Sequence, residues 1–581
     1  MNRKLALPAA RAFVWIALGF ALLSHLWAAN RGLEMTDEAS YLLIALDPWG
    51  TRGHGTFHGF LLRPLYLLGG QSLVGLRWIG YASLLFGAWR LAGAVRLRVG
   101  QGKSAVADFC TPVLMVAAMT AYCAGIRTPC YNWMILLGAM LAWSGWLRCG
   151  LSRNAPFEMG LGLAVALVGK WTATPFLVAT LLGLSLFKKS HGWGPSRSDW
   201  VGASLVGLAA AVGLLLYAGA EGIKNTLQAG VIAAQTIGSH GWFIVPKYAW
   251  EMFYYLYRVA RAYVWLLPAI LVFWWLAKRN PEKWKLERIA AILFTAGLAL
   301  AAVRGWWRGG IEQFSKESVL AGCWLLGVAW TVWAVSRKTD IRRRGTDEKN
   351  LWSGASGQSA VLWGLVATPF LCGIGTNTSI ADYAGQGTAF FVAAGILILG
   401  SLPAASIQSV AAVSLAGLCL IQASRISSSL LGMYRLGSVL EQSENLEVGP
   451  EAGHLRVDRN TRLQVETICK ILQQSGFTSG TPVVGVDSLC GWVYLAGGTS
   501  PGVPWFQRDQ AEFGRQVLAQ RDVRTLSSSW MWIRSSSQMK DPNRWWPPQI
   551  PAPSWREAGQ VALATDRGAE KLLLLCQKRD N

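Results

Sequence analysis

The sequence predicts a mainly α-helical protein that crosses a membrane many times and ends in a small α/β domain. Of its 581 residues, 52% are hydrophobic and only 15% are charged, whereas a soluble globular chain has roughly 25% charged residues. Long apolar runs recur as far as residue 422, and the composition turns polar after about residue 436. We therefore divide the chain into a transmembrane region, residues 1–435, and a soluble domain, residues 436–581.

About thirteen apolar segments are expected to be membrane spans, because a spanning helix needs roughly 20 apolar residues. They lie near residues 11–29, 71–95, 107–124, 131–148, 157–169, 172–187, 200–219, 260–277, 288–303, 318–335, 358–374, 386–401 and 405–422. The first segment has the basic start of a signal peptide, but its length and the spans that follow favour a retained helix.

The distribution of Lys and Arg among the turns predicts which ends of these segments face the cytoplasm. If the N-terminus is cytoplasmic, the cytoplasmic turns carry clusters of Lys and Arg, as at 337–349, and the opposite turn at 374–386 has none. This is the asymmetry of the positive-inside rule, which also accounts for much of the net charge of +22 without nucleic acid as a partner. The predicted location is a multi-pass inner (plasma) membrane protein, with a periplasmic or extracellular C-terminal domain. Long loops at about 30–70 and 220–259 then face outward, and the second suggests interfacial helices.

The C-terminal domain has its own signals of secondary structure. Helical periodicity runs through 460–476, and strands are predicted at 482–487, 528–535 and 571–579. The segment RWWPPQIPAPSW, residues 544–555, is expected to be a surface loop. One disulfide among Cys469, Cys490 and Cys576 is an alternative if this domain faces an oxidising compartment.

Two adjacent acids stand at the start of the first outer loop, in MTDEASYLLIALDPWG (residues 35–50). Thr36 is a suitable N-cap, and acids in a first helical turn suit the helix dipole, so Asp37 and Glu38 have a purely structural interpretation. That interpretation does not explain why an amphipathic helix, expected to lie along the membrane face, follows the first span directly. The alternative is an acidic active site at the outer membrane surface.

The order of short motifs resembles the GT-C superfamily of membrane glycosyltransferases, in particular protein O-mannosyltransferases and lipid A aminoarabinose transferases. A first span is followed by TDEASY, then by FLLRPLYLL (60–68), LRWIGYASLLFG (76–87) and GLAVALVGKWTATP (162–175). The resemblance covers roughly residues 10 to 190. It implies transfer of a sugar from a polyprenyl-phosphate donor to a glycan, lipid or protein acceptor, with Asp37 as general base and Glu38 as its orienting or acceptor-binding partner.

The leaving lipid phosphate gains negative charge as the sugar departs, so cations should face it. Arg63 in the RPLY element, Arg127 in an outer turn and Lys170 between two short spans are the candidates. Lys170 is the clearest of them, because a lysine among apolar residues is costly unless it is paired or solvated. Snorkelling of Lys170 to the interface is the structural alternative.

Weaker candidates for substrate contact come from polar outer loops. They are His54, His58, Tyr131, Asn132, Asn377, Asp382 and Tyr383. Each also has a structural interpretation, as an ordinary loop or turn residue. His54 and His58 with Asp37 would suit zinc, but the first outer loop has no D-x-D motif, so a divalent metal is not favoured and no cofactor is expected.

Other classes of protein remain as alternatives. A transporter or flippase of lipid-linked saccharides would explain intramembrane charges, but not an acidic pair at the surface, and no related halves are evident. An O-antigen-ligase-like enzyme would place its decisive residues in another loop. A membrane-anchored binding protein would leave the motifs of the first 190 residues unexplained. The sequence is compatible with protein, lipid A, secondary polysaccharide or teichoic-type acceptors.

Overall fold

The computed structural model describes most of the chain. The described residues are 3–51, 55–100, 105–124, 126–186, 193–236, 244–263, 348–375, 379–400, 415–419, 422–423, 425–427, 429–430, 438–507, 510–534, 541–565 and 568–577. The predicted segments 288–303 and 318–335, and most of 260–277 and 405–422, lie outside these ranges.

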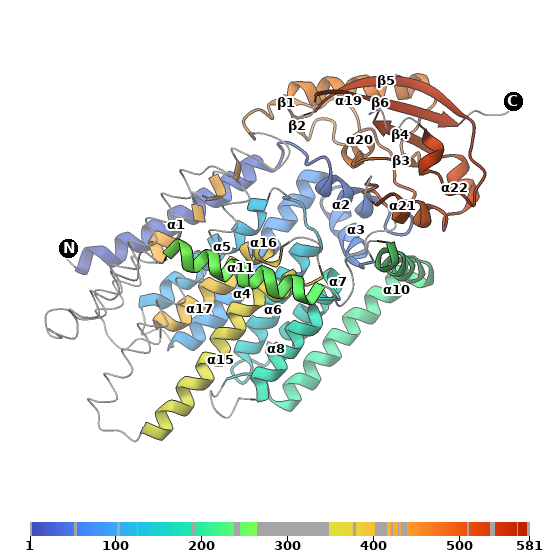
Figure 1. The fold of residues 1–581 in the computed structure, drawn as a ribbon. Coiled ribbons are helices and arrows are strands. Elements are labelled where there is room, and N and C mark those ends of the chain that lie inside the picture. Colours follow the sequence, from blue (N-terminus) through green and yellow to red (C-terminus); the bar gives the residue numbers. More distant parts are fainter. Residues whose placement is uncertain are drawn as a thin grey trace.

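Long helices form the larger part of the molecule, which we call the helical body (Figure 1). They are α1 (Arg3–Ala28), α4 (Leu73–Gly100), α5 (Cys110–Met119), α6 (Tyr131–Arg148), α7 (Ala155–Gly169), α8 (Thr174–Leu186), α10 (Arg197–Thr236), α15 (Glu348–Gly373) and α17 (Thr388–Gly400). Each coincides with a predicted apolar segment. Helices α6 and α7 touch through glycines, since a Cβ on Gly138 would lie 2.5 Å from the carbonyl oxygen of Gly162.

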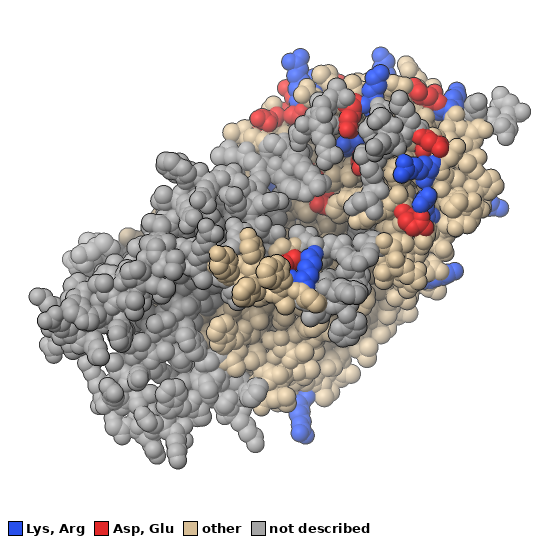
Figure 2. Space-filling model, viewed as in Figure 1, with Lys and Arg blue, Asp and Glu red and all other residues tan. Residues whose placement is uncertain are grey.

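Two helices within the described ranges are long and apolar enough to cross a bilayer. They are Pro8–Ala28 and Arg197–Thr236, with mean hydropathies of 1.6 and 2.1. Shorter apolar helices accompany them at Val106–Tyr122, Ala155–Gly169, Thr174–Leu186, Ala360–Gly373 and Thr388–Leu397. The thirteen predicted spans therefore stay a prediction. Large apolar side chains such as Ile16 and Leu216 are exposed, and the described surface of the helical body carries few charges (Figure 2).

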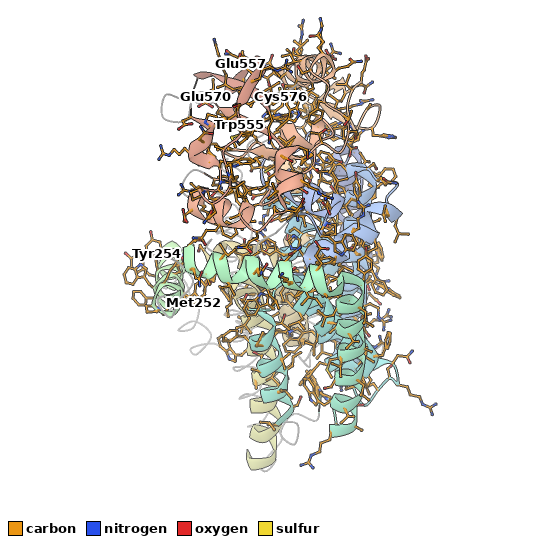
Figure 3. The ribbon with its side chains drawn as sticks, turned by 90° about the vertical axis from the view of Figure 1, so that its right-hand side faces the viewer. Met252, Tyr254, Trp555, Glu557, Glu570 and Cys576 are labelled. Atoms are coloured by element: carbon orange, nitrogen blue, oxygen red, sulfur yellow. The ribbon has the colours of Figure 1, made fainter. Side chains whose placement is uncertain are left out.

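The second outer loop forms helices that run across the helical body. Helix α10 kinks at Gly219, whose φ of 68° is in the left-handed region, and its second half turns away from the first (Figure 3). Helix α11 (Ile244–Tyr263) follows and exposes Trp250, Phe253, Tyr254 and Tyr257. The second outer loop therefore contains helices, and their place at a membrane interface stays a prediction.

Residues 438–577 contain the strands, and we call this part the sheet domain. Its sheet has the order β3 (Val483–Gly485), β4 (Trp530–Arg534), β6 (Gly568–Gln577) and β5 (Trp555–Thr565); β3 is parallel to β4 and the other pairs are antiparallel. A small pair, β1 (Glu444–Asn445) and β2 (Arg456–Val457), precedes α19 (Arg459–Gln474), α20 (Cys490–Leu495), α21 (Ala511–Leu518) and α22 (Val523–Ser527). The predicted helix and three strands correspond to α19, β3, β4 and β6, whereas β5 was not predicted.

The Pro-rich segment is only partly the surface loop that the sequence suggests. It begins in a 3-10 turn, η4 (Pro542–Trp545), and both Trp545 and Trp546 are buried. Trp545 packs edge-on against Phe506, with ring centres 5.7 Å apart. The prolines correctly predicted an irregular backbone. The segment is not fully exposed, because burying two adjacent indoles removes a large apolar area from water. Cys469, Cys490 and Cys576 are all free thiols, so no disulfide joins them.

Candidate active site

The acidic pair opens α2 (Asp37–Leu46), which the structure buries on all sides. Every residue from Asp37 to Ala45 is buried, so α2 does not lie on a membrane face as an amphipathic helix would. It packs against α3 (His58–Leu68) and beneath α20 of the sheet domain. The sequence could not show this, because the covering residues come from more than 400 positions away.

A third acid, Glu34, caps the helix instead of Thr36. Thr36 occupies the N-cap position, but its side chain makes no capping bond and its hydroxyl donates to Glu34 Oε1 at 2.5 Å. The other oxygen of Glu34 accepts the backbone N–H of Glu38 at 3.0 Å. Glu34 is fully buried and holds the turn from which Asp37 and Glu38 project.

Glu38 is fully engaged by protein groups. Its carboxylate accepts from Arg77 Nε at 2.9 Å and from Arg77 Nη2 at 2.5 Å, and from Thr128 Oγ1 at 2.6 Å. Burial by itself raises the pKa of Glu38, but the charge and hydrogen bonds of Arg77 outweigh it and hold that pKa below its usual value. Glu38 is therefore ionised, paired and turned toward the protein interior.

Arg127 reinforces this cluster rather than facing Asp37. Its guanidinium donates to the carbonyl oxygens of Ala28 and Arg31, at the end of α1. Arg77 donates to Ala29 and Gly32 in the same region. Burial, followed by the positive charge of Arg77, lowers the pKa of Arg127 to about 10, so it stays charged at neutral pH. Two cations thus satisfy carbonyls at a helix C-terminus, where positive charge is favourable. We call Glu34, Glu38, Arg77, Arg127 and Thr128 the Glu38 cluster.

The charge of Asp37 acts on a different set of groups, which includes Cys130 and Tyr41. The pKa of the Cys130 thiol is raised to about 11, chiefly by burial; the charge of Lys170 lowers it and the charge of Asp37 raises it. Burial also raises the pKa of Tyr41 well above its usual value, and the charge of Asp37 adds to that effect. Both carboxylate and ammonium therefore act on one small region around Cys130.

Lys170 ends α7 and points into this region. Its ammonium donates to the carbonyl oxygen of Cys372 at 2.9 Å and lies 4.2 Å from the ring centre of Tyr383 and 5.2 Å from that of Tyr131. The side chain is 3% exposed, which excludes snorkelling. Burial lowers the pKa of Lys170 to about 7. The two ring faces stabilise the ammonium cation of Lys170. Among the described residues, no carboxylate is hydrogen-bonded to this ammonium.

Aromatic side chains pack together in the same region. Tyr41, His58 and Tyr131 pack edge to face with ring centres 5.8 to 5.9 Å apart. The hydroxyl of Tyr131 lies 3.4 Å from that of Tyr383, on α16 (Ile380–Gln386). Together with Asp37, Cys130 and Lys170 these four residues form what we call the Asp37 cluster.

Asn132, which follows Tyr131 in α6, also has the capacity to bind a ligand. Asn132 is buried, and its Oδ1 has no hydrogen-bond partner among the described residues. An unsatisfied buried acceptor is costly, and a ligand or water can satisfy it.

The other predicted residues are not brought into this cluster. Arg63 donates to the carbonyls of Ala45 and Leu46, at the end of α2. His54 and Asn377 lie outside the described residues, and Asp382 is in α16 without a described side chain. In the described part of the chain, no group of three His, Cys, Asp or Glu residues is arranged to hold a metal. Metal dependence stays untested.

Arg77 and Glu34 are the important residues that sequence reasoning missed. Arg77 lies inside LRWIGYASLLFG, and a single arginine in an apolar helix is a detectable signal for a buried ion pair. Glu34 had no such signal, because an acid three residues before a helix is common in loops.

Comparisons with known proteins give one structural match. No family model and no curated protein matches the chain. The fold is similar to that of ArnT from Cupriavidus metallidurans in the apo state, at 14% sequence identity over 97% of this chain and 98% of that chain, with a TM-score of 0.40. At this level of similarity, no residue roles are transferred between the two.

Proposed function

We propose that this chain is an integral-membrane glycosyltransferase that moves a sugar from a polyprenyl-phosphate donor to an acceptor on the outer face. The observation that carries the proposal is the convergence of Asp37 and Lys170 on one aromatic cluster, while Glu38, next to Asp37, is committed to Arg77. The transfer needs a base for the acceptor and a positive charge for the departing phosphate.

Each residue then has a specific role. Asp37 takes the proton of the acceptor hydroxyl as its oxygen attacks the anomeric carbon, and the bond from that carbon to the phosphate oxygen breaks. Lys170 stabilises the charge on the leaving polyprenyl phosphate, and Tyr131 and Tyr383 orient Lys170. Arg127 and Glu38 act as positioning residues, since both are hydrogen-bonded to protein groups.

The membrane setting is part of the proposal. It is supported by the apolar helices Pro8–Ala28 and Arg197–Thr236, by exposed apolar side chains on them, and by α11, which lies across the helical body (Figure 1) and has four exposed aromatic residues. A helix of this kind suits the headgroup layer of a bilayer. The Asp37 cluster would then be reached from the outer leaflet, where a lipid-linked donor resides.

Asp37→Asn tests the proposal, with Asp47→Asn as the matched control ten residues later in the same loop. Both proteins receive a mixture of polyprenyl-phosphate sugars, and transfer is followed by mass spectrometry. Removal of a general base should lower kcat by roughly 10²- to 10⁴-fold for Asp37→Asn alone. Equal transfer by the two variants would remove Asp37 from the reaction, and movement of intact donor without product would favour a transporter.

A further inference from the structure

The sheet domain contacts the turn that leads into Asp37. Helix α20 lies over α2 (Figure 1), and the backbone N–H of Gly491 in α20 donates to the carbonyl oxygen of Met35 at 2.9 Å. Met35 lies between Glu34, which caps α2, and the N-cap residue Thr36. A contact at this position controls where the first turn of α2 begins.

Gly491 permits this contact because it has no side chain. A Cβ at position 491 would lie 2.8 Å from Met35 Cα and 2.6 Å from Met35 Sδ. The sulfur could move, but the Cα belongs to the backbone of the turn itself. Any larger residue must therefore displace either α20 or residues 34–37.

Other contacts anchor the sheet domain on both sides of Asp37. Before Asp37, the N–H of Gly32 donates to Arg456 O at 2.7 Å and the N–H of Arg456 donates to Asn30 O at 2.7 Å. After it, Thr51 Oγ1 donates to Ser500 O at 3.1 Å.

A further anchor lies on α4. The carboxylate of Glu451 accepts the N–H of Leu73, the first residue of α4, at 2.7 Å. With these anchors in place, α20 cannot easily shift away from the turn.

The charges of Glu34 and Asp37 also act on a thiol in the sheet domain. The pKa of the Cys490 thiol, next to Gly491, is raised well above its usual value by burial and further by the charges of Glu34 and Asp37. The thiol next to Gly491 therefore lies within electrostatic range of Glu34 and Asp37.

We propose that the sheet domain is a positioning element of the active site, in which Gly491 sets the place of the 34–37 turn and thereby of the Asp37 carboxylate. The catalytic part of this inference rests on the proposed function of Asp37. Misplacing a reacting group by about 1 Å can cost roughly a hundredfold in rate, so a shift of this turn should be visible in kcat.

The test compares Gly491→Ala with Gly559→Ala in the full chain. Gly559 is in β5 of the same domain, and the nearest atom to its Cβ would be Ile471 Cγ2 of α19 at 2.8 Å, so the added methyl group is equally crowded but does not press on α20. Two readouts are taken: hydrogen–deuterium exchange of the peptide covering residues 34–46, and the pH dependence of kcat for sugar transfer. Thermal unfolding of both variants checks that the domain folds.

We expect Gly491→Ala alone to raise exchange in residues 34–46, to lower kcat by about tenfold to a hundredfold, and to shift the acid limb of the pH profile, with a smaller effect on donor KM. Unchanged exchange in folded Gly491→Ala overturns the inference, as does equal exchange and kcat in both variants. If the parent protein transfers no sugar, the proposed function fails, and the exchange data still decide whether Gly491 positions the turn.

Discussion

Asp37 and Glu38 are neighbouring carboxylates in one helical turn, and the structure gives them opposite surroundings. Successive residues of an α-helix project about 100° apart, so the two side chains leave α2 toward different partners. Glu38 meets Arg77 and Thr128 and is completely buried. The charge of Asp37 acts on Cys130 and Tyr41, and the charge of Lys170 acts on Cys130 as well.

The adjacent acids of the sequence motif look equivalent, but their surroundings indicate two different roles. The Glu38 cluster joins α1, α2 and α4 through a buried ion pair and helix-end carbonyls, so its work is structural. The Asp37 cluster has a different composition: the ammonium of Lys170 lies over the rings of Tyr131 and Tyr383 and donates to a backbone carbonyl oxygen, and none of these contacts involves an arginine. Variants that affect stability and activity separately can test this division.

The largest effect on stability is expected for Glu38→Gln. It leaves the buried Arg77 without a counter-charge, which typically costs about 3–5 kcal/mol. Thermal unfolding in detergent measures the loss, and Asp37→Asn provides the comparison with a much smaller change. A stable Glu38→Gln protein with lost transfer would reverse the roles of the two acids.

Lys170→Met should affect activity more than folding. Removal of one group that stabilises the leaving charge typically lowers kcat by roughly 10²- to 10³-fold. Methionine removes the ammonium that lies over Tyr131 and Tyr383 but retains an apolar side chain of similar length, so the unfolding midpoint should change little. Full activity in this variant would separate Lys170 from the phosphate.

The charge of Lys170 should also appear in the pH dependence of the reaction. Because its pKa is lowered to about 7, the ammonium loses its proton as pH rises through 7, and kcat/KM for the donor should fall by up to about tenfold per pH unit above it. Arginine stays charged, so an active Lys170→Arg protein should lack this alkaline fall. The same fall in both proteins would assign it to another group.

The smallest effect is expected for Glu451→Gln, at the contact between the sheet domain and α4. Burial raises the pKa of Glu451 above 4.5, so its protonated form is favoured in the folded state. Its contribution is full below pH 4.5 and is lost as pH rises through the raised pKa. Glutamine should remove this pH dependence and change stability by only about 1 kcal/mol. A pH dependence that persists in the variant would exclude Glu451 as its source.

Local sequence determined which segments form helices and where chemistry could lie. Apolar runs predicted α4, α6, α7, α8 and α17 because burial of apolar area follows composition directly. The acids of α2 were recognisable from their place directly after the first span, and the lysine at the end of α7 because charge among apolar residues is costly. These signals are local, and the structure retains them as predicted.

Only the tertiary structure decided which of these charged groups face one another. Arg127 was predicted to bind phosphate, but it is committed to the end of α1, and Glu38 is committed to Arg77. Gly491 and Glu451 reach α2 and α4 from a domain hundreds of residues away. Side-chain direction and long-range contact depend on packing, which one sequence does not encode in any local pattern. The sequence by itself therefore named Asp37 and Lys170 as candidates, and packing decided that Glu38 pairs with Arg77 and that Lys170 lies against Tyr131 and Tyr383.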